Sequence, residues 1–184
     1  MARPYLVVVS GPPGAGTSTL ARAVADAIPC PSIGRDELKE GLVHAEGEYV
    51  FAPGDEAARR TLETFFGVVG FLVDAGVTVV AEAAFQHAPW ERGLRPLLDR
   101  ANVRIVRCHV DAAVARERIS RRAEAEPARR AVHGYQSIMQ PFETFRQSFE
   151  SFEPVTLPVP TIDVDTTDGY EPLLEEIAAF AGRA

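Results

Sequence analysis

A glycine-rich turn between an apolar run and a helix-forming segment is the feature that most constrains the fold of this 184-residue chain. The apolar run, Tyr5 to Val9, is typical of a buried strand in a parallel sheet. The turn follows directly, and the segment Leu20 to Ala25 continues as a helix. Glycines let successive backbone N–H groups point inward around an anion, and the N-terminus of the helix adds the positive end of its dipole. We therefore expect an anion site here, rather than a corner that only happens to be rich in glycine.

The spacing of the turn matches the phosphate-binding pattern Gly, four residues, Gly, Lys, then Ser or Thr, except at one position. Gly11 and Gly16 occupy the glycine positions, and Ser18 stands where a hydroxyl ligand of Mg2+ would stand. Thr17 occupies the lysine position, so the loop amides remain but the cation that touches the outer phosphates is lost. The segment expected to hold the phosphates of a nucleotide consists of Gly11, Pro12, Pro13, Gly14, Ala15, Gly16, Thr17, Ser18 and Thr19.

Composition limits the compartment and the partners. A net charge of −7 argues against long nucleic acid as a partner. There is no membrane-length apolar run and no signal segment, so we expect no membrane partner and a cytoplasmic protein. Cys30 and Cys108 are the only cysteines, which predicts no disulfide framework. Lys39 is the only lysine, so most cationic roles fall to arginine.

Strand-like and helix-like segments alternate along the chain, which predicts one α/β domain over residues 1–184. We expect three layers, with helices on both faces of a mostly parallel five-stranded sheet. The expected strands are residues 5–9, 32–33, 77–81, 103–110 and 161–165. The expected helices are residues 17–28, 35–43, 56–74, 90–100, 112–122 after an Asp111 cap, 135–149 with a break at Pro141, and 170–181. Residues 44–55 are typical of a loop that covers a substrate.

Two carboxylates follow predicted strands, where functional groups of parallel sheets gather. Asp36 could accept the proton of an attacking hydroxyl, or it could simply cap the helix that begins at Glu37. Glu82 could hold Mg2+ or its water, or it could be a surface carboxylate at a strand end. The residues alone leave both alternatives open.

Arginines are concentrated between the fourth expected strand and residue 130. Arg118 and Arg122 are four residues apart and share one helical face, so they could close over phosphates. The interleaved glutamates favour a solvated surface for some of the others. The full series is Arg116, Arg118, Arg121, Arg122, Arg129 and Arg130.

Three segments together resemble the small P-loop kinases that phosphorylate a hydroxyl group, such as the kinase domain of phage polynucleotide kinases and the bacterial gluconate and chloramphenicol kinases. Residues 11–22 resemble their phosphate loop except at Thr17, residues 34–39 resemble their Arg-Asp-x-x-Arg segment, and residues 110–122 resemble their strand and lid. The resemblance implies a P-loop NTPase fold with a helical lid at about residues 118–134.

The same resemblance implies roles for individual residues. Asp36 would activate the acceptor hydroxyl, Arg35 and Lys39 would contact the substrate, and Arg118 and Arg122 would clamp the donor phosphates. Glu82, with Ser18, would hold the metal, although these kinases often have an aspartate at the position of Glu82. Arg35 or a lid arginine could also supply the cation that Thr17 lacks.

These observations predict an ATP-dependent, Mg2+-requiring enzyme that transfers the γ-phosphate to a hydroxyl of a small molecule, nucleoside or nucleotide. The alternative is a nucleotide-binding sensor or partner protein that no longer catalyses, because Thr17 replaces the lysine. Transfer of a sulfuryl group from a nucleotide donor is a third hypothesis. The sequence indicates neither the acceptor nor the oligomeric state.

Overall fold

The computed structural model describes residues 3–47, 49, 52, 54, 56–133 and 136–182, except for the side chains of residues 127, 128 and 130. Its centre is a five-stranded sheet in the order β2-β3-β1-β4-β5, and every pairing between these strands is parallel. The strands are β1 (Tyr5–Ser10), β2 (Ser32–Gly34), β3 (Val79–Glu82), β4 (Asn102–His109) and β5 (Thr161–Asp165). The predicted α/β fold class is confirmed.

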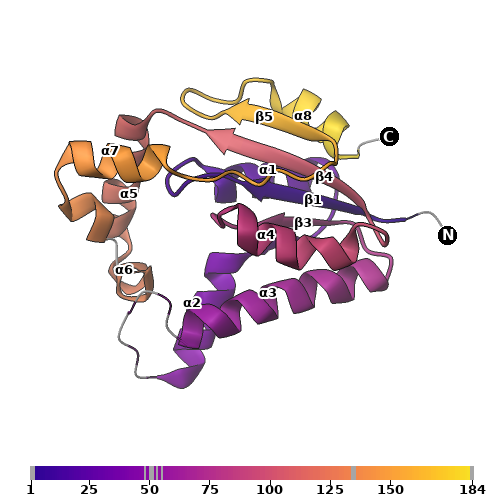
Figure 1. Cartoon of the computed structure of the whole chain (residues 1–184), viewed down its shortest axis with the longest axis horizontal. Coiled ribbons are helices and arrows are strands. Elements are labelled where there is room, and N and C mark those ends of the chain that lie inside the picture. Colours follow the sequence, from indigo (N-terminus) through magenta and orange to yellow (C-terminus); the bar gives the residue numbers. More distant parts are fainter. Residues whose placement is uncertain are drawn as a thin grey trace.

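Helices connect the strands and extend beyond the carboxyl end of the sheet (Figure 1). The α-helices are α1 (Thr17–Ala27), α2 (Arg35–Glu46), α3 (Glu56–Asp74), α4 (His87–Leu94), α5 (Ala112–Ala125), α6 (Pro127–His133), α7 (Phe142–Glu150) and α8 (Leu174–Ala181). Two 3-10 turns, η1 (Arg95–Leu97) and η2 (Gln136–Met139), precede β4 and α7. Within the described ranges, no helix combines the length and the apolarity needed to cross a bilayer.

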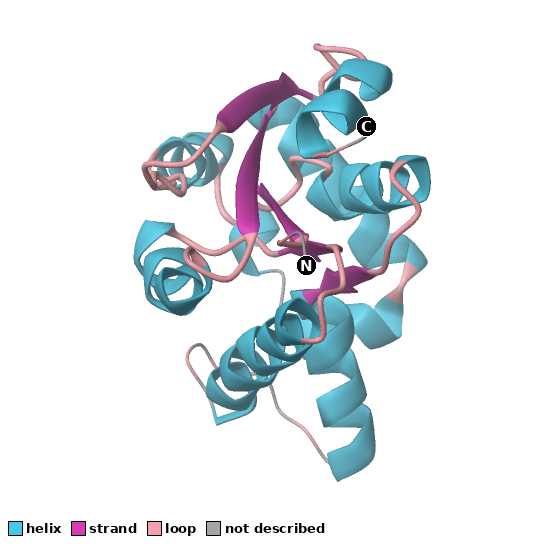
Figure 2. Ribbon diagram, turned by 90° about the vertical axis from the view of Figure 1, so that its right-hand side faces the viewer, coloured by secondary structure: helices cyan, strands magenta, loops and turns pink. Residues whose placement is uncertain are grey.

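Alternate residues of the central strands bury their side chains on opposite faces, which produces the three layers seen in Figure 2. Val7 and Val9 of β1 pack with α1, α5 and α8. Leu6 and Val8 pack with α3 and α4 on the other face. A strand buried on both faces must be apolar throughout, as the run at the start of the chain is.

The parallel register brings the carboxyl ends of neighbouring strands to one edge of the sheet. Glu82, the last residue of β3, lies opposite Val9 of β1 and Gly34 of β2. The phosphate loop, the start of α2 and the end of β3 therefore meet at this edge. This is the edge at which parallel α/β sheets bind ligands.

Prolines account for two helices whose predicted limits are wrong. The helix expected at residues 90–100 begins at His87 and changes to the 3-10 turn η1 after Leu94. Pro89 is accommodated in the first turn, whereas Pro96 has no N–H to continue the α-helical ladder. The helix expected from Tyr170 begins only at Leu174, after Pro172, because Glu171 pairs with Asp165 of β5.

Smaller differences concern element ends. The third strand begins at Val79 rather than at residue 77, and α2 continues to Glu46, so only part of the expected 44–55 loop is non-helical. Residues 48, 50, 51, 53 and 55 of that loop, and Gly134 and Tyr135 of the lid region, lie outside the described residues. The Asp111 cap is confirmed, since its carboxylate accepts a hydrogen bond from the Ala113 N–H at 2.7 Å.

An aromatic cluster fixes α3 and α4 against the sheet. The ring of Phe65 lies edge-on to Phe66, Phe85 and Trp90, with centroid distances of 5.1, 5.6 and 5.7 Å. The indole N–H of Trp90 donates to Ser10 Oγ at 2.9 Å, at the end of β1. The cluster therefore links the helical layer to the strand that enters the phosphate loop.

We expect Phe65→Ala to lower the free energy of unfolding by about 3–5 kcal/mol, because it removes a fully buried ring and leaves a cavity. Phe71 lies on the same helix but is 71% exposed, so Phe71→Ala should change stability by no more than about 0.5 kcal/mol. Urea denaturation followed by circular dichroism measures both. Equal losses in the two variants would contradict this account of the core.

Candidate functional site

The phosphate loop follows a path that only glycine allows at two positions. A Cβ on Gly11 would lie 2.6 Å from the carbonyl oxygen of Cys108 in β4. Gly14 has φ of +86°, and a Cβ there would lie 2.7 Å from the carbonyl oxygen of Ala115 in α5. The loop is thus pressed between β4 and α5 and ends at the first turn of α1.

The Glu82 carboxylate is held by the two hydroxyl residues that begin α1. Thr17 Oγ1 donates to Glu82 Oε1 at 2.5 Å, and Ser18 Oγ donates to Glu82 Oε2 at 3.2 Å. The Glu82 residue is only 5% exposed, so it is not a surface carboxylate. Thr17, which occupies the lysine position of the phosphate-binding pattern, therefore points at the Glu82 carboxylate instead of towards solvent.

Burial raises the pKa of Glu82 to about 7, although the hydrogen bond from Thr17 opposes the shift. The negative charges of Asp36 and Glu37 add to the increase. Glu82 therefore changes charge near neutral pH. A cation placed beside the carboxylate would favour its ionised form.

Asp36 lies at the second position of α2 and is surrounded by basic groups. Arg35 Nη1 lies 3.0 Å from Asp36 Oδ1, and Arg129 Nη2 lies 3.3 Å from Asp36 Oδ2. Burial by itself would raise the pKa of Asp36, but His133, Arg35 and Arg129 outweigh it and lower that pKa. The helix begins at Arg35 after Gly34, so the hypothesis that Asp36 caps a helix starting at Glu37 is wrong.

The segment that contains α6 is fastened to α2 by a set of ion pairs. Glu40 Oε1 lies 2.9 Å from His133 Nε2 and 3.4 Å from Arg129 Nε. Lys39 is 2% exposed, and its ammonium donates to the Val132 carbonyl at 3.2 Å. Two acids four residues apart on α2 thus face two bases four residues apart on α6.

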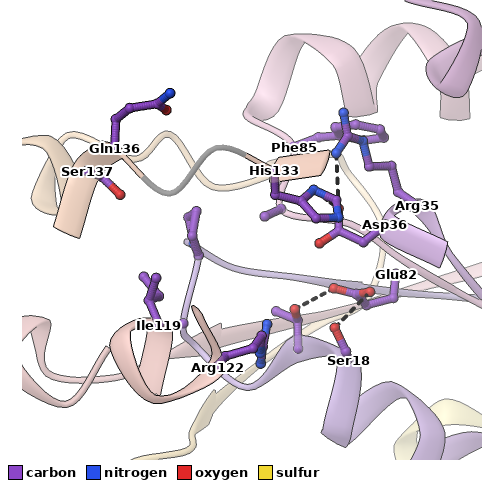
Figure 3. A pocket seen from close by; sticks show the side chains of 14 residues that line it. Ser18, Arg35, Asp36, Glu82, Phe85, Ile119, Arg122, His133, Gln136 and Ser137 are labelled. Atoms are coloured by element: carbon purple, nitrogen blue, oxygen red, sulfur yellow. Dashed lines mark hydrogen bonds and ion pairs between the residues drawn. The ribbon is translucent and has the colours of Figure 1, made fainter. Parts of the chain in front are cut away.

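A cavity of about 420 Å³ opens between the phosphate loop, α2 and the segment that follows α5. In Figure 3, Ser18, Arg35, Asp36 and Glu82 lie on one side, and Ile119 and Ser137 lie on the other. The predicted site residues that line it are Pro13, Gly14, Thr17, Ser18, Arg35, Asp36, Glu82 and Arg122. Lys39 and Arg118 are not among the lining residues.

Six residues that line this cavity were not selected from the sequence: Ala84, Phe85, Ile119, His133, Gln136 and Ser137. His133 could have been found from its four-residue spacing to Arg129, which matches the spacing of Asp36 to Glu40. Phe85 lies three residues after the end of β3, and no sequence pattern distinguishes it from a core phenylalanine. Its ring belongs both to the aromatic cluster and to the cavity.

The two arginines of α5 that were predicted to clamp phosphates, Arg118 and Arg122, have different surroundings. The guanidinium of Arg118 donates to the carbonyl of Thr166 at 2.7 Å and lies 3.5 Å from the Gly14 carbonyl, which joins α5 to the phosphate loop and to the segment after β5. Arg122 lines the 420 Å³ cavity and also a neighbouring cavity of about 520 Å³. None of the described residues accepts a hydrogen bond from the Arg122 guanidinium.

Other members of the arginine series have structural contacts. Arg116 donates to the carbonyl of Gln140 at 2.8 Å. Arg121 lies 3.7 Å from Glu117 in an exposed pair, as expected for a solvated surface. The side chain of Arg130 lies outside the described part of the chain.

A family model described as AAA domain matches residues 6–150, which is most of the chain. The chain belongs to this AAA domain family. No curated protein sequence matches this AAA domain protein.

Several of the solved structures similar to this AAA domain protein are described as kinases. A "putative kinase" from Chloroflexus aurantiacus superposes with a TM-score of 0.81 at 22% identity, covering 97% of this chain and 96% of that one. A gluconokinase from Sinorhizobium meliloti gives 0.54 at 19% identity, covering 97% and 89%. The APS kinase of Mycobacterium tuberculosis, solved with AMPPNP and APS, gives 0.60 at 18% identity, covering 97% and 95%. The resemblance to P-loop kinases is thus confirmed for the fold.

The raised pKa of Glu82 predicts how stability depends on pH. The folded protein binds the Glu82 proton more tightly than the unfolded chain does, so the free energy of unfolding should fall as pH rises from about 4.5 to about 7. Within that window, the titration of Glu82 lowers the free energy of unfolding by about 1 kcal/mol per pH unit.

Urea denaturation between pH 4.5 and 8 measures this dependence. In Glu82→Gln, the decline in the free energy of unfolding that comes from Glu82 should be absent. Glu117→Gln removes an exposed carboxylate and is the control, in which the decline should remain. A decline that is the same in wild type and in Glu82→Gln would contradict the assignment.

Proposed function

We propose that this protein is an ATP-dependent phosphotransferase that moves the γ-phosphate to a hydroxyl of a small molecule. The observation that carries the proposal is the cavity in which the mouth of the phosphate loop, at Gly14 and Ser18, meets the ionised carboxylate of Asp36. We treat residues 1–184 as one domain with a lid at about residues 118–134. The free thiols of Cys30 and Cys108 fit a reducing cytoplasm, where ATP is abundant.

The donor would extend from the phosphate loop into the 520 Å³ cavity. That cavity lies between Gly16 and Thr19 of the loop region, Arg118 of α5, and Thr166 and Tyr170 after β5. We assign the β-phosphate to the backbone N–H groups of residues 11–19, at the N-terminus of α1. Arg118 holds the walls of this cavity together through its bonds to Gly14 and Thr166.

We assign to Arg122 the cationic role that Thr17 cannot perform. The Thr17 hydroxyl is bonded to Glu82, whereas Arg122 lines both the donor cavity and the cavity that contains Asp36. An arginine at the junction of donor and acceptor can stabilise charge on the transferred phosphoryl group. Arg118 is less suited to this cationic role, because its guanidinium already donates to the backbone carbonyls of Thr166 and Thr167.

The oxygen atoms of Ser18 and Glu82 fit a hard divalent cation such as Mg2+, which binds few protein ligands and keeps several waters. When bound, Mg2+ supplies charge neutralisation to the phosphates. Thr17 orients the Glu82 carboxylate from the other side, and burial keeps that carboxylate away from bulk solvent.

On the acceptor side, Asp36 would accept a hydrogen bond from the attacking hydroxyl and take its proton as the oxygen bonds to phosphorus and the bond to ADP breaks. Arg35 is suited to hold the acceptor or the transferred group, because its Nε is buried with no hydrogen-bond partner among the described residues. Lys39 would act on the acceptor indirectly, by holding the Val132 backbone of the lid.

Calorimetric titration with ATP, with and without Mg2+, tests the donor site. We expect micromolar affinity that Mg2+ strengthens.

Arg122→Ala should lower turnover by about 10³-fold or more, because the transferred charge loses its cation. Arg95→Ala removes an exposed arginine remote from both cavities and is the control.

The outcomes separate the hypotheses. Absence of ATP binding up to millimolar concentrations would contradict the kinase assignment. ATP binding without phosphoryl transfer to any acceptor would favour the alternative, a nucleotide-binding protein disabled by Thr17.

Asp36→Asn tests the acceptor side. It keeps the shape of the side chain but removes its charge, so we expect kcat to fall by about 10²–10⁴-fold while the Kd for ATP stays the same. Turnover is measured by transfer of radioactive γ-phosphate. Wild-type turnover in Asp36→Asn would exclude this role for Asp36.

A further inference from the structure

A third cavity, of about 320 Å³, lies where the end of α7 and the residues after it meet the carboxyl ends of β1 and β4. The chain leaves α7 and runs alongside β4 before it enters β5 (Figure 1). We call this cavity the β4 pocket. Among the described residues, it shares no lining residue with the 420 Å³ or the 520 Å³ cavity. Its volume lies within the roughly 300–1,000 Å³ of pockets that hold small molecules.

The floor of the β4 pocket is a row of three polar side chains on neighbouring strands. The parallel register pairs Ser10 of β1 with Arg107 of β4, and Arg107 with Asp163 of β5. Residues paired in this way point to the same face of the sheet. It is the face that α3 and α4 cover, because Val8 and Ile105, two residues earlier on their strands, pack there. The apolar layer of that face thus ends in a polar row.

Two donors of this row have no acceptor among the described residues. Ser10 is 1% exposed, and its Oγ accepts the indole N–H of Trp90 at 2.9 Å, but nothing described accepts the Ser10 hydroxyl proton. Arg107 donates to Asp163 through Nε at 2.7 Å and through Nη2 at 2.8 Å, which leaves its Nη1 without a described acceptor. A buried donor favours a ligand that brings an acceptor to it.

The charges of the floor are balanced within the protein. The hydrogen bonds from Arg107 lower the pKa of Asp163, so the pair carries one positive and one negative charge at neutral pH. His109, at an exposed position of the lining, lies 3.8 Å from Asp165 of β5. Within the described part of the chain, both bases that line the β4 pocket therefore face an acid. A neutral ligand keeps this balance, whereas an ionised ligand would lose its hydration without gaining a free opposite charge.

The remaining lining is apolar, and its position is fixed by other contacts. Phe149 and Phe152 contribute aromatic rings. Glu153, the next residue, is bonded on both sides of its backbone to the start of α4. Its N–H donates to the Gln86 side chain at 2.6 Å, and its carbonyl accepts the His87 N–H at 2.9 Å. Because the aromatic wall is already in place, a ligand would lose little free energy in ordering it.

We infer that the β4 pocket binds a further small molecule, a neutral aromatic compound that carries a hydrogen-bond acceptor such as a carbonyl group. Its ring lies against Phe149 and Phe152, and its acceptor receives the Ser10 hydroxyl and Arg107 Nη1. The inference goes beyond the proposed function, because the nucleotide and the phosphate acceptor would occupy the other two cavities.

Four compounds built on one skeleton test the ligand class. They are 1-indanone, indane, and two relatives that are charged at neutral pH, indane-1-carboxylate and 1-aminoindane. Each is titrated into the wild-type protein while amide chemical shifts are recorded by NMR. We expect 1-indanone to bind with a Kd on the order of 1 mM or below and to shift the amides of residues 10, 11 and 107–109. The other three should bind about tenfold more weakly, because they lack the acceptor or carry a charge.

Two results of this titration would overturn the inference. One is no binding of 1-indanone at several millimolar. The other is tighter binding of indane-1-carboxylate or 1-aminoindane than of 1-indanone.

His109→Trp locates the bound compound. His109 lines the pocket from an exposed position at the end of β4, so an indole there would fill the pocket while the strand stays intact. We expect the affinity for 1-indanone to fall by about tenfold or more. Thr161→Trp is the matched control, since Thr161 is exposed on the neighbouring strand and does not line the pocket. It should bind 1-indanone as wild type does.

Arg107→Met tests the donor without filling the pocket. It keeps a long side chain but removes Nη1, so we expect 1-indanone to bind about tenfold more weakly. Asp163→Asn leaves Arg107 in place without its balancing charge. This variant should still bind 1-indanone and should bind indane-1-carboxylate more tightly than wild type does. Wild-type affinity for 1-indanone in both His109→Trp and Arg107→Met would overturn the inference.

A non-hydrolysable ATP analogue separates this inference from the proposed function. We expect 1-indanone to bind equally well with and without the analogue, because the two sites share no described lining residue. Displacement of 1-indanone by the analogue would contradict a separate site. If the analogue does not bind, the proposed function fails, while the titration of the protein with 1-indanone alone still decides this inference.

Discussion

The hydrogen bonds from Thr17 and Ser18 to the buried Glu82 carboxylate are the interaction on which the rest of the site depends. They join the first turn of α1 to the end of β3, and so fix the mouth of the phosphate loop against the sheet. An acid that is nearly excluded from water requires such partners. A lysine at position 17 would bring a positive charge to this place, whereas a threonine brings only a hydroxyl, which leaves the cationic role to another element.

The proposed function assigns that cationic role to the helical segment beyond the carboxyl end of the sheet. Arg118 attaches α5 to the loop, and the ion pairs of Arg129 and His133 with Asp36 and Glu40 attach α6 to α2. Arg122 lies between these two attachments and faces both cavities. The same contacts hold α6 beside the cavity that contains Asp36.

Much of the fold could be predicted from local patterns. The buried run of β1, the glycine spacing of the loop and the Asp111 cap are short-range features, and the structure contains all three. Helix ends near Pro96 and Pro172 were predicted wrongly, because a proline is tolerated or excluded according to its place in the turn and to the pairing of its neighbours. Asp36 and Glu82 could be selected as site residues from their places after strands, but their protonation could not, since it depends on burial and on charges from distant segments.

By itself, the sequence determined that strand, glycine loop and helix follow one another, that the sheet is mostly parallel, and which side chains share a helical face. Only the tertiary structure decided that the Lys39 ammonium bonds to the Val132 carbonyl, that Arg118 binds carbonyls while Arg122 faces the cavities, and that His133 lies in the cavity beside Asp36. The physical reason is that the spacing of residues along the sequence indicates only which side chains of one helix or strand point the same way. What lies opposite them is set by the packing of elements that are far apart in the chain, here α2 against α6 and α5 against the phosphate loop.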